Sequence, residues 1–286
     1  MKKIMVATDL SERSDRAVRR AVLLAKQTGA RLMLIHVVDD DQPARIVESE
    51  QAVAGDLLCR QSATLNSVDG VECEARIVLA YAFAGIARAA EEIAPDLLVL
   101  GPHRRQALRD VFVGTTAERT LRSVSCPVLM AIAPPVGAYR HAMLATDLSE
   151  DARHAARSFE GLRIASPASS SILHVFDAPE LRRTLNHAVG EEEKLAHLQD
   201  MRRDADRALA GFIKDLGGTW GKRIVTRRME PVAREILAVS NERNADLIVM
   251  GTRRTGMEKF LLGSVAEQVV RLSTHDVLAI PPCCRD

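Results

Sequence analysis

Two copies of one short motif place a carboxylate where an apolar strand gives way to a helix. The segment Ala7–Glu12 reads Ala-Thr-Asp-Leu-Ser-Glu, and the same six residues return as Ala145–Glu150. A carboxylate accepts hydrogen bonds, so Asp9 and Asp147 are suited to hold the hydroxyl groups of a sugar. In α/β proteins ligands bind where strands end, which is the expected place of both residues.

Glycines followed by a hydroxyl residue supply the other half of a binding chemistry. A glycine ends an apolar run at Gly101 and Gly251, and Gly114-Thr115 and Gly263-Ser264 precede helical patterns. The first N–H groups of a helix are free and the helix dipole is positive there, so both favour a phosphate. A carboxylate and a phosphate site in the same domain together predict a nucleotide pocket. The alternative is that the aspartates only cap helices and the glycines only make turns.

The repeats extend over the whole chain and divide it into two similar halves. Four blocks recur in the same order, which indicates a duplicated domain; they begin at Ala7, His36, Asp96 and Gly114 in the first half and at Ala145, His174, Asp246 and Gly263 in the second. The sequence Pro-Pro-Val-Gly at 134–137 marks the boundary, so we predict domains at 1–136 and 137–286. A length of 286 residues fits two domains, each long enough to bury a core.

Hydrophobic periodicity predicts alternating strands and helices in both halves. Strands are expected at 3–8, 31–38, 71–79, 97–100, 127–132, 142–146, 171–176, 222–229, 247–250 and 277–280, with helices between them. Ser11 is expected to cap the first helix and Gly29 to end it. This order predicts an α/β fold: two tandem doubly wound domains, each with a five-stranded, mostly parallel sheet.

The composition of the chain limits the classes of partner that it is expected to bind. The chain has 39 Lys and Arg against 38 Asp and Glu and only 3% aromatic residues, which speaks against nucleic acid. No apolar run reaches the roughly 20 residues of a membrane span, and the first residues read as a strand rather than a signal peptide, so we expect a cytoplasmic protein. Cys59, Cys73 and Cys126 lie in apolar patterns and are expected to be inert core thiols, and no metal-site spacing is present.

Searches for catalytic motifs find none, so we expect a protein that is not an enzyme. The Walker, Rossmann, zinc-protease and nucleophile-elbow patterns are absent. His36 and His174 follow apolar strand residues and are expected to be structural. His103 lies in a loop and is the one histidine suited to a site, but its counterpart is Thr252.

The repeated blocks resemble the universal stress protein family in its tandem form, over nearly the whole chain. One branch of that family binds nucleotide through a G-x2-G-x9-G-(S/T) loop after the fourth strand. The resemblance implies an adenine-nucleotide alpha hydrolase-like fold with ATP, with or without Mg²⁺, as the ligand. It places ribose at the aspartates, the adenine edge at the end of the second strand and phosphates at the glycine loops. The predicted binding set is Ala7, Asp9, Val37, Gly101, Arg104, Gly114 and Thr115, and Asp147, Val175, Gly251, Arg254, Gly263, Ser264 and Val265.

Both halves depart from that loop pattern. Arg104 stands where the second glycine is expected, and in the second half the loop is one residue short with Arg254 at the corresponding position. A side chain there either blocks phosphate or holds it through a guanidinium group. The two readings stay open, as does the choice of half.

Assembly and partners follow from the same resemblance. The family pairs through its last strand, so Val128–Ile132 and Val277–Ile280 are expected to join the two halves as a pseudo-dimer, with a further homodimer left open. The interval from His174 to Asp246 exceeds its counterpart, which predicts a longer helix there, either solvated or used to bind a partner or cover a ligand. We expect a stress-response regulator that binds adenine nucleotide; the alternatives are a tandem stress protein with degenerate sites that binds another ligand, or a scaffold that binds a partner protein.

Overall fold

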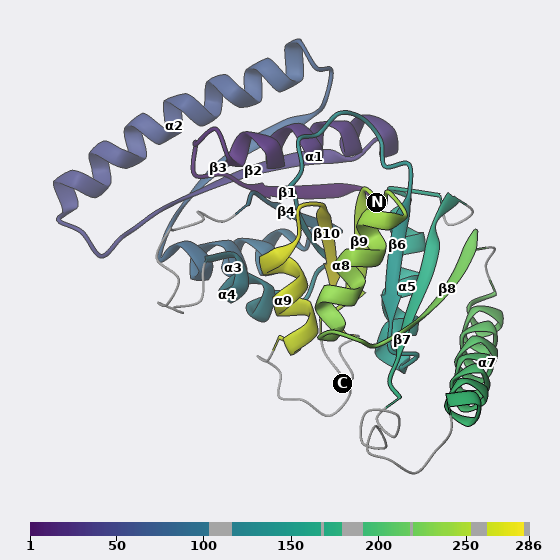
Figure 1. The fold of residues 1–286 in the computed structure, drawn as a ribbon. Helices are drawn as coiled ribbons and strands as arrows, with labels where there is room; N and C mark the ends of the chain where they lie inside the picture. Colours follow the sequence, from purple (N-terminus) through teal and green to yellow (C-terminus); the bar gives the residue numbers. More distant parts are fainter. Residues whose placement is uncertain (103–115, 167–168, 179–190, 218–219, 253–261, 283–286) are drawn as a thin grey trace.

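One continuous sheet runs through both halves of the chain. The computed structural model describes residues 1–102, 116–166, 169–178, 191–217, 220–252 and 262–282. Its ten strands lie in the order β3-β2-β1-β4-β5-β10-β9-β6-β7-β8 (Figure 1). They are β1 (Lys3–Ala7), β2 (Arg31–Val38), β3 (Cys73–Leu79), β4 (Leu97–Leu100), β5 (Val128–Met130), β6 (Ala142–Thr146), β7 (Ser171–Phe176), β8 (Lys222–Arg227), β9 (Leu247–Gly251) and β10 (Asp276–Ile280). The predicted α/β fold with five strands in each half is confirmed.

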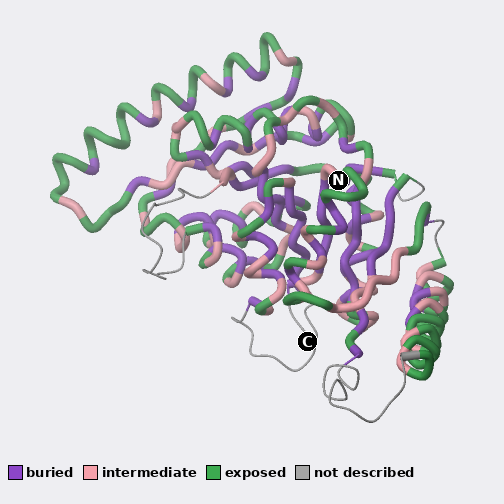
Figure 2. Tube along the Cα trace, in the orientation of Figure 1, coloured by how far each residue is buried: buried purple, intermediate pink, exposed green. Residues whose placement is uncertain are grey.

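Helices cover both faces of the sheet. The described helices are α1 (Ser14–Thr28), α2 (Ala44–Ser67), α3 (Ala82–Ile93), α4 (Thr116–Ser123), α5 (Glu150–Leu162), α7 (Glu191–Leu216), α8 (Val232–Glu242) and α9 (Ser264–Leu272). Apolar residues of α1, α2, α5 and α7 pack in one cluster, and those of α3, α4, α8 and α9 pack in another on the opposite face. The central strands are therefore buried almost throughout, as Figure 2 shows, which explains their continuous apolar sequences.

The two halves join through their last strands. β5 and β10 pair antiparallel, with Leu129 opposite Leu278, whereas the strand pairs within each half are parallel. The predicted pseudo-dimer is thus present inside one chain. Because the junction is antiparallel, the carboxyl ends of the strands in the two halves point in opposite directions along the sheet. A site at the carboxyl ends must therefore be built by each half alone.

A buried carboxylate fastens the connection between the halves. Asp276, fully buried at the start of β10, accepts hydrogen bonds from the backbone N–H groups of Ile132 and Ala133 at 2.8 Å each. Its second oxygen accepts the Tyr139 hydroxyl at 2.5 Å and forms an ion pair with Arg20 Nε at 3.0 Å. Arg20, on α1, also donates to a linker carbonyl at 2.6 Å and lies over the Tyr139 ring. The cluster ties the linker to elements of both halves.

Most helices and strands begin and end within two residues of the predicted positions. Gly29 ends α1 in the left-handed conformation, with φ of 71°. The prediction of a longer helix in the second half is confirmed, but by little: α7 has 26 residues and α2 has 24. In the described part of the chain, no helix combines the length and apolarity that a membrane span requires.

The cysteines differ in exposure, and one prediction about them was wrong. Cys59 is exposed on α2, because its position falls on the outer face of the helix, whereas Cys73 is buried and Cys126 is partly buried. Burial raises the pKa of the Cys126 thiol to about 11. Cys283 and Cys284 lie outside the described residues.

We expect Cys126 to react far more slowly with iodoacetamide than Cys59. The thiolate is the nucleophile, and at pH 8 only about one Cys126 thiol in a thousand is ionised if its pKa is about 11. Its rate should rise about tenfold for each unit of pH up to that value. Peptide mass spectrometry after timed alkylation between pH 7 and 10 measures both rates, and equal rates at pH 8 would contradict the assignment.

Candidate functional site

In each half the order of the strands reverses at the strand that leads into the repeated aspartate motif. In the first half β1 lies between β2 and β4, and in the second half β6 lies between β7 and β9. The chain leaves each of these strands toward one side and later returns on the other. Such a reversal opens a crevice at the carboxyl ends of the two neighbouring strands, where α/β proteins bind ligands.

At the first crevice the residues after β1 form a tight loop around a carboxylate. Leu10 has a φ of 60°, which residues other than glycine rarely adopt, and its N–H donates to Thr8 Oγ1 at 3.0 Å. Asp9 Oδ1 accepts the Ser11 N–H at 3.1 Å and the Ser11 hydroxyl at 2.5 Å. The loop thus fixes one carboxylate oxygen while the Asp9 side chain remains exposed.

The second crevice repeats this geometry. Leu148 has a φ of 66° and donates to Thr146 Oγ1 at 2.9 Å, and Ser149 donates its N–H to Asp147 Oδ1 at 3.1 Å. The same left-handed leucine occurs in both halves, so the loop shape is a property of the duplicated motif. Asp9 and Asp147 therefore occupy equivalent places at opposite ends of the sheet.

The electrostatics of Asp9 favour its charged form. Burial raises the pKa of Asp9, but hydrogen bonds from Ser11 and Ser14 and the nearby charge of Arg13 lower it by more, so the pKa lies below its usual value. The carboxylate is consequently ionised at neutral pH and accepts hydrogen bonds. It would lose this ability only as the pH falls through the lowered pKa.

The Ser11 hydroxyl accepts a first-turn N–H group of α1, as predicted, although the helix begins later than a capping residue at Ser11 implies. α1 begins at Ser14 with Arg13 in the capping position, and the Ser11 hydroxyl accepts the N–H of Ser14 at 3.4 Å while it donates to Asp9. In the second half the equivalent Ser149 is the capping residue of α5 and accepts the N–H of Ala152 at 3.2 Å. The same contact between a serine hydroxyl and the N–H three residues later therefore occurs in both halves.

Two histidines hold the end of the central strand in place. His36 Nδ1 lies 2.9 Å from the Thr8 carbonyl, and His174 Nδ1 lies 3.0 Å from that of Thr146. Each ring thereby fixes the residue directly before the site aspartate. Their predicted structural role is confirmed.

The glycines at the ends of β4 and β9 have different surroundings. A Cβ on Gly101 would stand 3.1 Å from the Arg13 carbonyl oxygen and from the Ser14 Cα, so the start of α1 approaches it closely. At Gly251 the nearest atom among the described residues would be the Asp151 carbonyl oxygen, 3.7 Å away. Helix packing therefore accounts for the glycine in the first half, whereas the described helices do not account for the one in the second half.

We expect Gly101→Ala to destabilise the fold and Gly251→Ala to leave it nearly unchanged. Crowding of backbone against a new methyl group costs about 1–3 kcal/mol, whereas ordinary contact costs little. Thermal unfolding followed by circular dichroism compares the two variants, each serving as the control for the other. Equal melting temperatures would show that α1 can move away from Gly101.

The two valines predicted to contact the adenine edge lie next to the last residues of β2 and β7. Val37 and Val175 are both half-buried. A Cβ on Gly85 of α3 would stand 2.7 Å from Val37 Cγ1, so α3 packs on this edge through a glycine. At the same distance from the start of the corresponding helix, the second half has Glu235, whose Oε1 accepts the N–H groups of Met229 and Glu230 at 2.9 and 2.8 Å.

The first half has an exposed aromatic residue at the carboxyl-end side of its sheet that the repeated motifs do not indicate. Tyr81 follows the end of β3, is 53% exposed, and donates its hydroxyl to Asp41 Oδ2 at 2.7 Å. The second half has Pro231 at the corresponding place before its helix. The sequence signal for this residue is a tyrosine directly before a predicted helix in a chain with few aromatic residues.

The remaining predicted residues divide into described and undescribed ones. Ser264 is exposed at the first position of α9, with Gly263 as its capping residue, so the predicted helix start is confirmed there. Ala7 ends β1, and Val265 packs against the core. His103, Arg104, Gly114, Thr115 and Arg254 lie outside the described residues. Within the part of the chain that is described, no group of three His, Cys, Asp or Glu side chains is arranged to hold a metal ion.

Comparisons with known proteins agree with this architecture. A model of the universal stress protein family matches residues 1–131 and 138–281. A universal stress protein of Methanocaldococcus jannaschii is 31% identical over 144 residues, which cover 50% of this chain and 82% of that protein. A crystal structure of a universal stress protein from Archaeoglobus fulgidus has a TM-score of 0.69 at 19% identity and 98% coverage of both chains. A putative universal stress protein from Pseudomonas aeruginosa has a TM-score of 0.65 at 19% identity, covering 99% of this chain and 94% of that one. The chain belongs to the universal stress protein family and carries its domain twice in tandem.

Proposed function

We propose that the protein binds an adenine nucleotide, ATP or a relative, at the carboxyl ends of the strands and acts as a regulator in a stress response. The observation that carries this proposal is the aspartate loop, which both halves build with a leucine at positive φ. A left-handed non-glycine residue costs about 1–2 kcal/mol, and such strain is concentrated at functional sites. A loop with only a structural role could use glycine at Leu10 and Leu148 and avoid the cost.

The proposed contacts follow from the geometry of each crevice. The fixed carboxylate of Asp9 or Asp147 accepts the ribose hydroxyls, and the helix start after β4 or β9 faces the phosphates. Asp147 follows β6 and Gly251 ends β9, and these strands are direct neighbours. In this proposal the nucleotide acts as a ligand, with Mg²⁺ accompanying its phosphates.

We further propose that the first half holds the tighter site. Tyr81 offers an exposed ring at the carboxyl-end side of the sheet in the first half, after the strand next to β2, and its hydrogen bond to Asp41 limits its motion. Stacking of a base on an aromatic ring contributes about 1–3 kcal/mol. Pro231 in the second half cannot supply that contact.

The alternative function is a tandem stress protein whose sites no longer take nucleotide and bind another ligand or a partner protein. The packing of α1 against Gly101 favours it, because that glycine is then kept for the fold and not for phosphate. The arginines in the two loops are compatible with either function.

Calorimetric titration of the full chain with ATP and MgCl₂ tests the proposal. We expect heat with a micromolar dissociation constant and one site per chain, or two sites of unequal affinity. GTP serves as the control for the base, and should bind at least about tenfold more weakly if the adenine edge is read. Absence of heat and of thermal stabilisation at millimolar ATP would select the alternative.

A further inference from the structure

The last strand of the sheet, β8, presents hydrogen-bonding groups on its outer side. β8 is an edge strand, paired with β7 alone. Lys222 and Arg228 donate their N–H groups to Ser170 and Phe176 on the β7 side. In a parallel ladder alternate residues bond to the same neighbour, so Arg223, Val225 and Arg227 turn their N–H and C=O groups away from β7.

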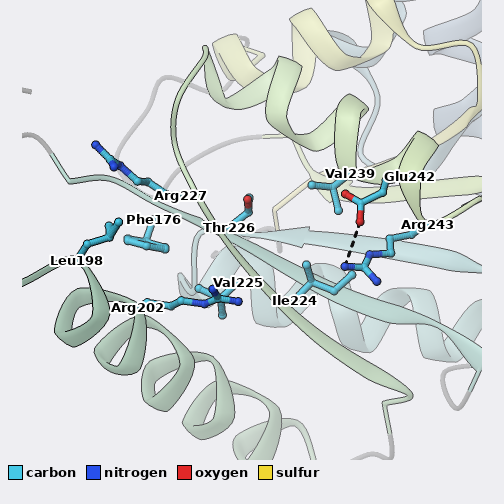
Figure 3. Close-up of a pocket in the computed structure, with 10 residues that line it drawn as sticks. All are labelled: Phe176, Leu198, Arg202, Ile224, Val225, Thr226, Arg227, Val239, Glu242 and Arg243. Atoms are coloured by element: carbon cyan, nitrogen blue, oxygen red, sulfur yellow. Dashed lines mark ion pairs between the residues drawn. The ribbon is translucent and has the colours of Figure 1, made fainter. Parts of the chain in front are cut away.

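A hollow of about 270 Å³ follows this edge and lies on both sides of it (Figure 3). Val225 packs toward the face covered by α7, and Ile224 packs toward the face covered by α8. The α7 side of the hollow is lined by Phe176, Leu198, Arg202, Val225 and Arg227, and the α8 side by Ile224, Thr226, Val239, Glu242 and Arg243. The hollow is therefore not confined to one helix–sheet interface but wraps around the strand.

The charges on the two sides differ. On the α8 side Arg243 pairs with Glu242 at 3.3 Å, so the two charges on that side offset each other and Ile224 and Val239 supply its aliphatic surface. On the α7 side Arg202 and Arg227 have no carboxylate partner among the described residues, and Arg227 Nε is buried without a hydrogen bond. This side thus carries two positive charges beside the ring of Phe176.

The opposite edge of the sheet is built differently. At β3, Arg76 forms an ion pair with Glu92 at 2.6 Å. Register relates the edges, because Ile77 pairs with His36 and Val225 with His174, which places Ile224 at the position of Arg76. The second half therefore has an aliphatic residue where the first half has a charged pair, and charged residues on an edge strand oppose the addition of a further strand.

We propose that β8 receives an extended segment of a partner protein as an added strand, and that this segment alternates acidic and aliphatic residues. Side chains of an added strand alternate between the two faces, as the two sides of the hollow do. The acidic side chains lie against Arg202 and Arg227, and the aliphatic ones against Ile224 and Val239. A second copy of this chain fits poorly, since pairing of β8 with itself would place Lys222, Arg223 and Arg227 next to the same positively charged residues of the other copy.

A labelled peptide that alternates aspartate and valine over eight residues provides the test. We expect fluorescence anisotropy to show saturable binding to the full chain, and a peptide of equal composition with its aspartates and valines in two blocks to bind at least about tenfold more weakly. In amide NMR spectra, binding should protect the N–H groups of Arg223, Val225 and Arg227 from exchange. The electrostatic share is measured with the double variant Arg202→Glu, Arg227→Glu, which should weaken binding at least about tenfold.

Two further variants complete the design. Val225→Pro removes an outward N–H without touching a bond to β7 and should abolish binding, provided that its circular dichroism spectrum is unchanged. Arg60→Glu, an exposed arginine on α2 near the far edge, serves as the matched charge control and should bind normally. Equal binding of both peptides, no binding of the alternating peptide at 1 mM, or dimerisation of the chain through β8 in sedimentation would overturn the proposal.

Discussion

Replacement of Asp276 by alanine should lower the free energy of unfolding by about 3–5 kcal/mol, the usual loss when one partner of a buried ion pair is removed. The variant leaves Arg20 buried at 4% exposure with no carboxylate, and it removes the acceptor of two backbone N–H groups and the Tyr139 hydroxyl. Urea unfolding followed by circular dichroism measures the change.

Asp246→Ala is the matched control, because Asp246 also accepts two successive backbone N–H groups, from Arg140 and His141, but its ion-pair partner Arg140 is exposed. We expect it to cost only about 1–2 kcal/mol. The double variant Arg20→Met, Asp276→Ala should recover part of the loss, since no unpaired charge remains buried. Similar losses of unfolding free energy for Asp276→Ala and Asp246→Ala would show that burial of the Arg20–Asp276 ion pair does not increase the cost of removing the carboxylate.

Asp9→Asn should weaken ATP binding at least about tenfold, because a charged acceptor for the ribose hydroxyls is lost. Asparagine keeps an oxygen that can accept the Ser11 N–H, so the loop is expected to persist. Calorimetry with ATP measures the affinity of the variant and of the unmodified chain.

The ribose contact is isolated by 2′,3′-dideoxy-ATP. The unmodified chain should bind this analogue about as weakly as the Asp9→Asn variant binds ATP, and the variant should not distinguish the two nucleotides. Asp147→Asn is the internal control and should have the smaller effect if the first half holds the tighter site. A variant that binds ATP normally would remove Asp9 from the site.

The sequence predicted the parts of the fold that depend on local pattern and on the repeat. Apolar runs located the ten strands, and the order of the blocks predicted the duplicated domain. The joining of the halves through the last strands was implied by the family resemblance alone. The start of the first helix could not be placed to the residue: the Ser11 hydroxyl accepts the Ser14 N–H and donates to Asp9, but α1 begins only at Ser14.

Features that depend on contacts between distant segments could not be predicted. Asp276 stands where the first half has Pro127, and nothing local shows that it receives N–H groups of the linker. Likewise the close approach of α1 to Gly101 and of α3 to Val37 follows from packing in three dimensions. The aspartates of the candidate site were recognisable only because the chain contains their motif twice.

The antiparallel junction of β5 and β10 changes what a single substitution can do. If two separate copies met through this strand pair, every substitution would appear on both sides of the axis at once. In the joined chain it appears in one half only, so equivalent positions of the two halves can hold different residues. Examples are Tyr81 and Pro231, Gly85 and Glu235, and Arg76 and Ile224. Fusion therefore permits a division of labour, in which one half keeps an inherited pocket while the other half acquires a new edge for recognition.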